Sequence, residues 1–341
     1  MTELQSRIDG VRTFFQNNDI SLGYRKLLDC VADTQDLNLY KDAIELTEWK
    51  EKFPENVDEF VSRSESILSK VSEKNIEPYQ VDLPTIKVDS ICKSYGKNKF
   101  ALGPVSLELK KGEVYGLVGE NGNGKTTLLR ILAKEISCDS GQLEYSFKHN
   151  HDSNYDLRTK LVYIPQRTKK WYGSLKDNLK FVLSNYSIDP EENEIRTLMM
   201  IARMGIWNYK DLKWSELSSG YKMRFELART LLRQPEILLL DEPLANLDVL
   251  AQQLILEDLK SICNSINNPI ALILSSQQLY EVEKVSDKVI YLENGKQNID
   301  IDTAPVDEVP LIIEIDSKAE RENLIKVFNT LSLNKLIYNG G

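Results

Sequence analysis

Apolar residues recur at helical spacings along the first part of the chain. Ile8, Val11 and Phe15 are three and four positions apart, and three similar sets follow before residue 79. This spacing places the apolar side chains on one face of a helix. The pattern therefore predicts four amphipathic helices in residues 1–79, which fit a small all-α bundle. We find no catalytic constellation in them and interpret the bundle as a structural or docking appendage.

The pattern changes after the linker "EPYQVDLP". Apolar and polar residues then alternate, as in "TIKVDSICKSY", which is typical of strands. Helical and strand-like segments follow each other until about residue 300, so residues 84–300 are predicted to form an α/β domain around a largely parallel sheet. Residues 306–341 alternate once more as strand, helix and strand, which predicts a short βαβ-like C-terminal extension.

Composition narrows the class of protein. The 341 residues carry a net charge of -9, which argues against nucleic acid as a partner because such binding needs a basic face. The four cysteines show no C-x-x-C spacing and are expected to be reduced core residues. The first residues lack a signal-peptide pattern, and no apolar run approaches the ~20 residues that span a bilayer. A membrane role would need a partner that supplies the membrane part.

The stretch "VGENGNGKTTLLR" carries the first chemical signal. It fits G-x-x-x-x-G-K-[ST] at every fixed position, with Gly119, Gly124, Lys125 and Thr126, between a strand and a helix. Glycines let backbone N–H groups approach an anion closely, and the following helix offers its positive end. Residues 119–127 are therefore predicted to hold nucleotide phosphates.

A second signal is "EILLLDEPLANLD", in which a buried strand ends in two acids. Asp241 at the strand end suits a Mg²⁺ shell, and Glu242 suits polarising an attacking water. A third signal is "LSSGYKMRFELARTLLRQP", where a Ser-Ser-Gly turn opens into a helix. Serine is a common helix cap, but the same geometry also favours an anion.

Together these motifs resemble the ATP-binding-cassette (ABC) ATPases over roughly residues 84–300. "LSSGY" lies where that family carries L-S-G-G-Q, with Ser219 in place of the first glycine and Tyr221 in place of glutamine. Gln166 in "YIPQ" and Asp248 in "LANLD" match two further family motifs. The implied fold is a P-loop NTPase cassette of the ABC type, with a mixed or parallel sheet and a helical signature subdomain.

The resemblance implies a site for ATP and Mg²⁺. Glu242, Gln277 and Gln166 would be catalytic, and Thr126, Gln166 and Asp241 would surround the metal. The residues expected to bind the nucleotide are Tyr95, Gly119, Asn121, Gly122, Asn123, Gly124, Lys125, Thr126 and Thr127, with Ser218 and Gly220 contributed by a second copy.

The chain departs from the family at the switch position, where Gln277 stands in "ILSSQQ" instead of histidine. Glutamine donates an amide hydrogen bond but cannot become positively charged. We predict that hydrolysis persists through Glu242 and is slower than with histidine; the alternative is that Gln277 is fully competent. The only histidines, His149 and His151, lie out of register, and a metal site between them is a minor alternative.

A mixed basic and aromatic stretch, "RTKKWY", follows Gln166 in the region where the family docks its membrane subunits. Trp171 is therefore a candidate docking residue, and a solvated loop is the alternative. The next segment, "SLKDNLKF", resembles a stretch found in cassettes that serve exporter-type permeases.

The resemblance implies the ATPase subunit of a transporter. It would form a homodimer around two ATP and drive a multi-span permease, most readily as an exporter, from the cytoplasmic face of the cell membrane. One alternative is a soluble ABC protein on ribosomes or DNA, which lacks support because tandem cassettes and a long coiled coil are missing from the sequence. Another is a regulatory ATP-dependent clamp, suggested by "LSSGY" and Gln277.

Overall fold

The computed structural model describes residues 2–79, 83–96, 100–147 and 154–302, with the backbone alone at 154–156 and 299–302. Residues 2–302 belong to one compact unit. The predicted extension at 306–341 lies outside the described residues.

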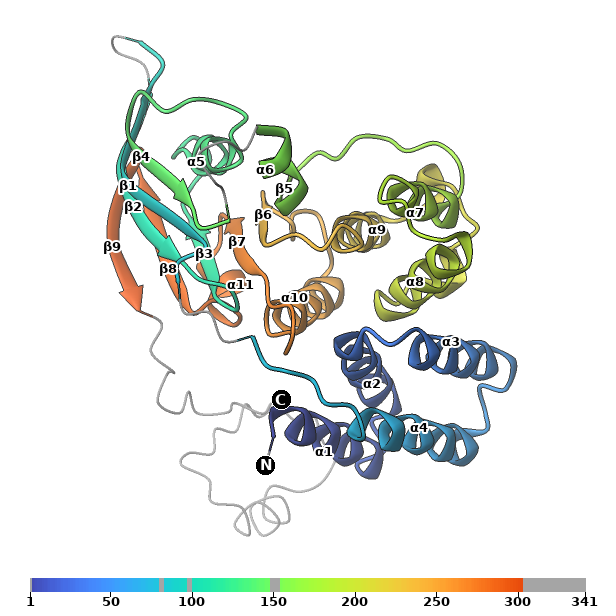
Figure 1. Ribbon diagram of the computed structural model, residues 1–341. Helices are drawn as coiled ribbons and strands as arrows, with labels where there is room; N and C mark the ends of the chain where they lie inside the picture. Colours follow the sequence, from blue (N-terminus) through green and yellow to red (C-terminus); the bar gives the residue numbers. More distant parts are fainter. Residues whose placement is uncertain (1, 80–82, 97–99, 148–153, 303–341) are drawn as a thin grey trace, which may run out of the picture. The chain divides into compact units, whose positions relative to one another are not determined.

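Four helices open the chain and pack against one another (Figure 1). They are α1 (Glu3–Gln16), α2 (Ile20–Thr34), α3 (Leu37–Lys52) and α4 (Val57–Ser72). Side-chain oxygens of Thr2, Asp19 and Asp36 accept hydrogen bonds from N–H groups of the first turns, which fixes where three of the helices begin. The apolar stripes face inward, and the four helices predicted from the spacing are confirmed.

Two sheets follow. A three-stranded antiparallel sheet has the order β2-β1-β4, and a six-stranded sheet has the order β5-β6-β7-β3-β8-β9. The strands are β1 (Ile86–Ser94), β2 (Ala101–Leu109), β3 (Val114–Val118), β4 (Ser140–Tyr145), β5 (Leu161–Ile164), β6 (Ile237–Leu240), β7 (Ala271–Ser276), β8 (Lys288–Glu293) and β9 (Lys296–Asp302). In the larger sheet only β9 runs antiparallel to its neighbour, so the predicted largely parallel sheet is confirmed.

Helices connect these strands and flank the larger sheet. They are α5 (Lys125–Leu132), α6 (Asn154–Lys160), α7 (Leu175–Ser184), α8 (Pro190–Arg203), α9 (Ser219–Leu231), α10 (Val249–Cys263) and α11 (Leu279–Glu283). Figure 1 shows α7 and α8 side by side, away from the strands, as a helical region. Strands β3, β6 and β7 are buried along their whole length, as is usual for parallel strands covered on both faces.

The parallel arrangement decides where the polar side chains meet. The carboxyl ends of parallel strands lie at one edge of a sheet, and β3, β5, β6 and β7 are neighbours there. The chain leaves these four strands toward the glycine-rich loop, Gln166, Asp241 and Gln277 respectively. The sheet therefore collects motifs that are far apart in the sequence.

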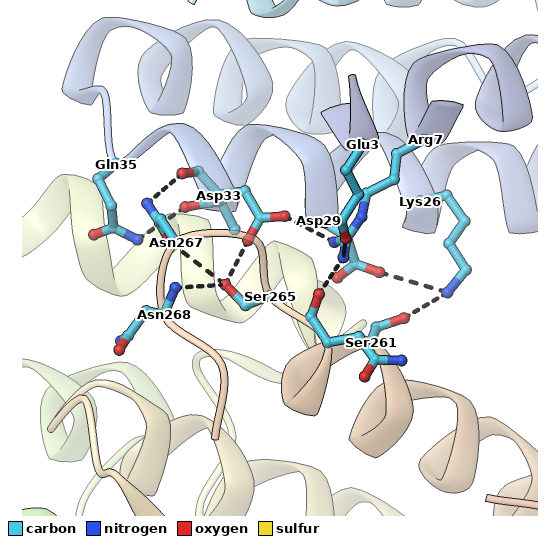
Figure 2. Close-up of polar contacts among 12 residues, drawn as sticks. Glu3, Arg7, Lys26, Asp29, Asp33, Gln35, Ser261, Ser265, Asn267 and Asn268 are labelled. Atoms are coloured by element: carbon cyan, nitrogen blue, oxygen red, sulfur yellow. Dashed lines mark hydrogen bonds and ion pairs between the residues drawn. The ribbon is translucent and has the colours of Figure 1, made fainter. Parts of the chain in front are cut away.

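The bundle contacts the opposite, amino-terminal edge of the sheet through the segment 264–268, which precedes β7. Figure 2 shows Asp33 of α2 at the centre of this contact. Its carboxylate accepts hydrogen bonds from Ser265 (2.6 Å) and Arg7 (2.9 Å), and its carbonyl oxygen accepts one from Asn267 (2.6 Å). Burial raises the pKa of Asp33, while the Ser265 hydrogen bond and the charges of Arg7 and Arg203 favour its charged form.

A second set of contacts joins α2 to the helical region. Asp29 accepts a hydrogen bond from Nε of Arg203 on α8 at 3.0 Å, and Lys26 donates to Ser261 on α10 at 2.5 Å (Figure 2 labels Asp29, Lys26 and Ser261). Helix α2 thus touches both α8 and α10. Among the described residues, no helix combines the length and apolar character needed to cross a bilayer.

Candidate active site

The glycine-rich loop joins β3 to α5 in a space that excludes side chains. A Cβ on Gly119 would lie 2.4 Å from the carbonyl oxygen of Leu292. A Cβ on Gly124 would lie 2.7 Å from the Phe100 ring, and Gly124 has a φ of +99°, which L-residues rarely adopt. Both glycines are therefore required by the structure itself, before any ligand is considered.

Lys125 extends back into this loop. Its side chain is buried, and its Nζ donates to the carbonyl oxygens of Gly119 (2.6 Å) and Glu120 (3.3 Å). The same Nζ lies 3.3 Å from Oε1 of Glu242. The lysine charge is thus placed between the loop and the acid that follows β6.

The remaining predicted loop residues surround this lysine. Asn123 is half-buried, and its Oδ1 accepts a hydrogen bond from the Asn294 N–H at 3.2 Å. Asn121 and Gly122 are exposed, and Gly122 has a φ of +86° with open space around it. Thr127 is half-buried in the first turn of α5. The loop is held from one side and open on the other, which suits contact between its N–H groups and an anion.

Three hydroxyl groups converge on the Asp241 carboxylate. Thr126 donates to Oδ2 at 2.8 Å, Tyr163 donates to Oδ2 at 3.0 Å, and Ser275 donates to Oδ1 at 2.9 Å. Burial and the negative charge of Asp241 raise the pKa of Tyr163, so this phenol stays a donor. Thr126 and Asp241 are adjacent oxygen ligands of the kind that Mg²⁺ takes up with one carboxylate and phosphate oxygens, so the donor set fits that ion.

Glu242 receives two amide donors on one oxygen. Gln166 Nε2 lies 2.8 Å and Gln277 Nε2 lies 2.9 Å from Glu242 Oε2. Glu242 has a φ of +48°, in the left-handed region, which turns its carboxylate from the end of β6 toward these amides and Lys125. The structure therefore brings together all the residues predicted to be catalytic.

Tyr95 lies beside the loop rather than within this cluster. It follows β1, is 47% exposed, and its N–H bonds to the carbonyl of Phe100 at 3.3 Å. The Phe100 ring is the group that a side chain at Gly124 would strike. The backbone of Tyr95 is thus linked to the residue that packs on Gly124, and its contact with the nucleotide stays a prediction.

Ser218 and Gly220 are separate from the cluster within one chain. Ser218 caps α9 through the Tyr221 N–H, and a Cβ on Gly220 would lie 3.5 Å from Ala251 Cβ on α10. Among the described residues, neither makes a hydrogen bond or ion pair with the residues around Asp241 and Glu242. Asp248 caps α10 by accepting from the Ala251 N–H at 2.8 Å.

Tyr163 and Ser275 are the two site residues that the sequence analysis missed. Ser275 is a polar residue in the otherwise apolar run of β7 and is fully buried. A buried hydroxyl in such a strand needs a hydrogen-bond partner, and this was the available signal. Tyr163 was harder to identify, because a tyrosine in a strand is usually interpreted as a packing residue.

The aromatic stretch after Gln166 divides into two roles. Trp171 Nε1 donates to Oε1 of the buried Glu226 at 2.7 Å, and its ring contacts Phe225 and the Arg229 guanidinium. Trp171 is half-buried and packs against the core, and a docking role for it stays a prediction. Tyr172, in contrast, is 90% exposed.

The minor alternative of a metal site at His149 and His151 lies outside the described residues. Within the part of the chain that the structure describes, no group of three or more His, Cys, Asp or Glu side chains could hold a metal ion. The Thr126–Asp241 pair is a different kind of site, because it offers one carboxylate and one hydroxyl and leaves the other positions around Mg²⁺ to phosphate oxygens and water.

Comparison with known proteins gives a consistent result. The family model described as "ABC transporter" matches residues 102–245. The chain is 32% identical over 62% of its length to the Fe(3+) ions import ATP-binding protein FbpC of Fusobacterium nucleatum, and this match spans 56% of that relative. It is 33% identical over 62% of its length to an uncharacterized ABC transporter ATP-binding protein of Methanocaldococcus jannaschii, covering 76% of it. The chain thus spans little more than half the length of the iron protein.

A solved structure shows the same fold. CbiO1 of Clostridium perfringens, described as part of the ABC transporter complex cbiONQ, superposes with a TM-score of 0.60. The match covers 74% of this chain and 96% of cbiO1 at 23% sequence identity.

Proposed function

Because this chain belongs to the ABC transporter family, we propose that it is an ATP-binding and ATP-hydrolysing subunit that drives a separate membrane permease. One observation carries the proposal. Three distant motifs form a single cluster of hydrogen bonds and ion pairs at the carboxyl edge of the sheet. The glycine-rich loop supplies Lys125 and Thr126, the segment after β6 supplies Asp241 and Glu242, and the segment after β5 supplies Gln166.

Substrate binding follows from the loop. The N–H groups of residues 119–127 and the Lys125 ammonium would hold the phosphates of ATP, because they present positive charge in a narrow space. Tyr95 would stack on adenine with its exposed ring. Thr126 and Asp241 would hold Mg²⁺, which when bound neutralises part of the phosphate charge.

Hydrolysis follows from Glu242. As a water oxygen attacks the γ-phosphorus, the Glu242 carboxylate accepts the water proton, the bond to the β-phosphate oxygen breaks, and ADP leaves. Gln166 and Gln277 hold Oε2 of Glu242 in place through their amide groups. Lys125 Nζ lies 3.3 Å from Oε1 of the same acid and forms an ion pair with it.

The site also requires a second copy of the chain. Ser218 and Gly220 lie at the N-terminus of α9, and a partner would supply this helix end to the γ-phosphate. Near Asp248, the side chains of Val249 and Leu250 are 70% and 65% exposed. Exposed aliphatic residues beside this motif support a face that a second copy covers on ATP binding.

The permease, the position at the cytoplasmic face of the membrane and the direction of transport complete the proposal. Export was predicted from "SLKDNLKF" and stays a prediction. The names of several relatives, FbpC among them, state import, which argues against export. Nucleic acid remains unexpected as a partner because of the net charge of -9.

A second candidate function is an ATP-dependent regulatory clamp without transport. The observation that favours it is Gln277, whose uncharged amide holds Glu242 where the family has a histidine. Slow turnover with a long-lived, closed dimer is the behaviour that this arrangement would produce.

Turnover of purified protein with ATP and Mg²⁺ tests the proposal. Glu242→Gln keeps the size of the side chain and removes the proton acceptor, so hydrolysis should fall at least about 100-fold while ATP binding persists. Lys125→Ala should weaken binding itself. In light scattering, Glu242→Gln with ATP should be dimeric; a wild-type chain that neither binds nor hydrolyses ATP contradicts the proposal.

Co-purification separates the two candidate functions. Tagged protein isolated from native membranes should carry a multi-span protein if it is a transport subunit. Its isolation without such a protein, with slow hydrolysis in solution, would support the clamp.

A further inference from the structure

We propose that Ser275 is a positioning residue that couples the Mg²⁺ ligand Asp241 to the proton acceptor Glu242; this inference rests on the proposed function. Its hydroxyl donates to Oδ1 of Asp241 at 2.9 Å. The same oxygen accepts a hydrogen bond from the backbone N–H of Glu242, also at 2.9 Å. The Ser275 Oγ atom therefore links the proposed metal ligand Asp241 to the proposed proton acceptor Glu242.

The sheet places this hydroxyl. Strands β6 and β7 are parallel neighbours, and Leu240 pairs with Leu274 at the end of their register. The next residue on each strand is Asp241 or Ser275, so the two side chains meet directly beyond the last pair. Ser275 is fully buried, and water does not replace the bonds that its hydroxyl makes.

The bond to the Glu242 N–H acts at a strained position. Glu242 has a φ of +48°, a conformation that costs a non-glycine residue energy and persists only where the surroundings hold it. The Ser275 hydroxyl provides such a constraint at the peptide group that sets the direction of the Glu242 side chain. Without it, the carboxylate loses its fixed position relative to Gln166 and Gln277.

Serine suits this role because a hydroxyl donates one hydrogen bond and accepts others at the same time. Alanine and valine can do neither. Threonine keeps the hydroxyl and has nearly the shape of valine, so Ser275→Thr and Ser275→Val form a matched pair that differs in hydrogen bonding and adds similar bulk. Ser64, a fully buried serine of α4 that bonds within its own helix, provides a control for losing a buried hydroxyl elsewhere.

The first measurement uses no nucleotide. Hydrogen–deuterium exchange of the peptide that contains Glu242 should be at least about tenfold faster in Ser275→Val than in Ser275→Thr, because only threonine retains an acceptor for that N–H. Unchanged exchange in both Ser275→Val and Ser275→Ala would overturn the proposal, whether or not the protein proves to be an ATPase.

The second measurement uses a fluorescent ATP analogue, with Mg²⁺ and with EDTA, together with ATP turnover. In Ser275→Ala and Ser275→Val, binding in EDTA should stay within about twofold of wild type, the gain from Mg²⁺ should shrink, and kcat should fall about tenfold. For Ser275→Thr, kcat and the effect of Mg²⁺ on binding should stay within about threefold of wild type. Ser64→Ala should change only the unfolding midpoint.

The outcomes separate a failure of the role given to Ser275 from a failure of the proposed ATPase function. If kcat falls as much in Ser275→Thr as in Ser275→Val, the packing of the side chain matters rather than its hydroxyl, and the inference is wrong. If wild type binds and hydrolyses ATP while Ser275→Ala keeps its kcat and its Mg²⁺ gain, the inference is likewise wrong and the proposed function stands. A wild-type protein inert toward ATP contradicts the function alone, and the exchange result still decides whether Ser275 holds Glu242.

Discussion

Arg25 on α2 donates a hydrogen bond at 2.5 Å to Asp258 on α10, which lies 233 positions later in the chain. Asp258 is 8% exposed, and Arg224, near the start of α9, is its second cationic neighbour at 3.7 Å. Burial raises the pKa of Asp258, and the two arginines oppose that shift. One buried carboxylate thus joins the N-terminal bundle, the sheet domain and the helix that Ser218 caps.

We predict that Arg25→Ala strongly destabilises the fold. Removing one partner of a buried ion pair leaves the other charge desolvated, so the free energy of unfolding should fall by about 3 kcal/mol, moderated by Arg224. Denaturant titration measures it. Lys41→Ala is the control, since Lys41 and Glu191 form an ion pair that is exposed on both sides and worth at most about 1 kcal/mol. Equal effects of the two variants would contradict the structural role given to Asp258.

Gln277→His should raise the rate of ATP hydrolysis. The Gln277 amide holds Glu242 Oε2 at 2.9 Å but stays neutral, whereas a histidine can also place a positive charge near the transferred phosphate. We expect a severalfold increase in kcat, and a loss of at least about tenfold for Gln277→Ala, which removes the hydrogen bond. If histidine brings no gain, glutamine is a full substitute at this position.

Trp171 and Tyr172 should respond differently to truncation. Trp171 is bonded to Glu226 and packed on Phe225, so Trp171→Ala should lower the free energy of unfolding by about 2 kcal/mol. Tyr172→Ala should change it by less than about 0.5 kcal/mol because the ring is exposed. Thermal unfolding compares the two. A Trp171→Ala variant as stable as wild type would contradict the packing role given to Trp171.

The cysteines should divide into two classes toward alkylation. Burial raises the pKa of Cys30 to about 12 and also raises that of Cys263. At pH 8 the thiolate fraction of Cys30 is therefore only about 10⁻⁴, whereas Cys92 and Cys138 are partly exposed. Iodoacetamide and mass spectrometry should find modification at Cys92 and Cys138 alone until denaturant is added.

The raised pKa of Cys30 also makes the stability of the fold depend on pH. Unfolding returns the Cys30 thiol to its ordinary pKa of 9.0, so unfolded chains lose this proton more readily than folded ones. The contribution of Cys30 to stability is present below pH 9 and declines as the pH rises toward 12. Cys30→Ala should weaken that decline in denaturant titrations between pH 8 and pH 11.

The sequence by itself determined the local elements and the chemical types. Helical spacing predicted the four N-terminal helices, a continuous apolar run predicted the buried strand before Asp241, and fixed motif positions identified Lys125, Asp241 and Glu242. These features are readable because periodicity and motif spacing are local properties of the chain.

Only the tertiary structure decided which of these groups meet. Strand order placed Ser275 beside Asp241 and Gln277 beside Glu242, although 34 and 35 positions separate the members of these pairs. It also turned Trp171 inward and bonded Arg25 to Asp258. Such contacts depend on the register of neighbouring strands and on which helix faces become buried, and no short stretch of sequence contains that information.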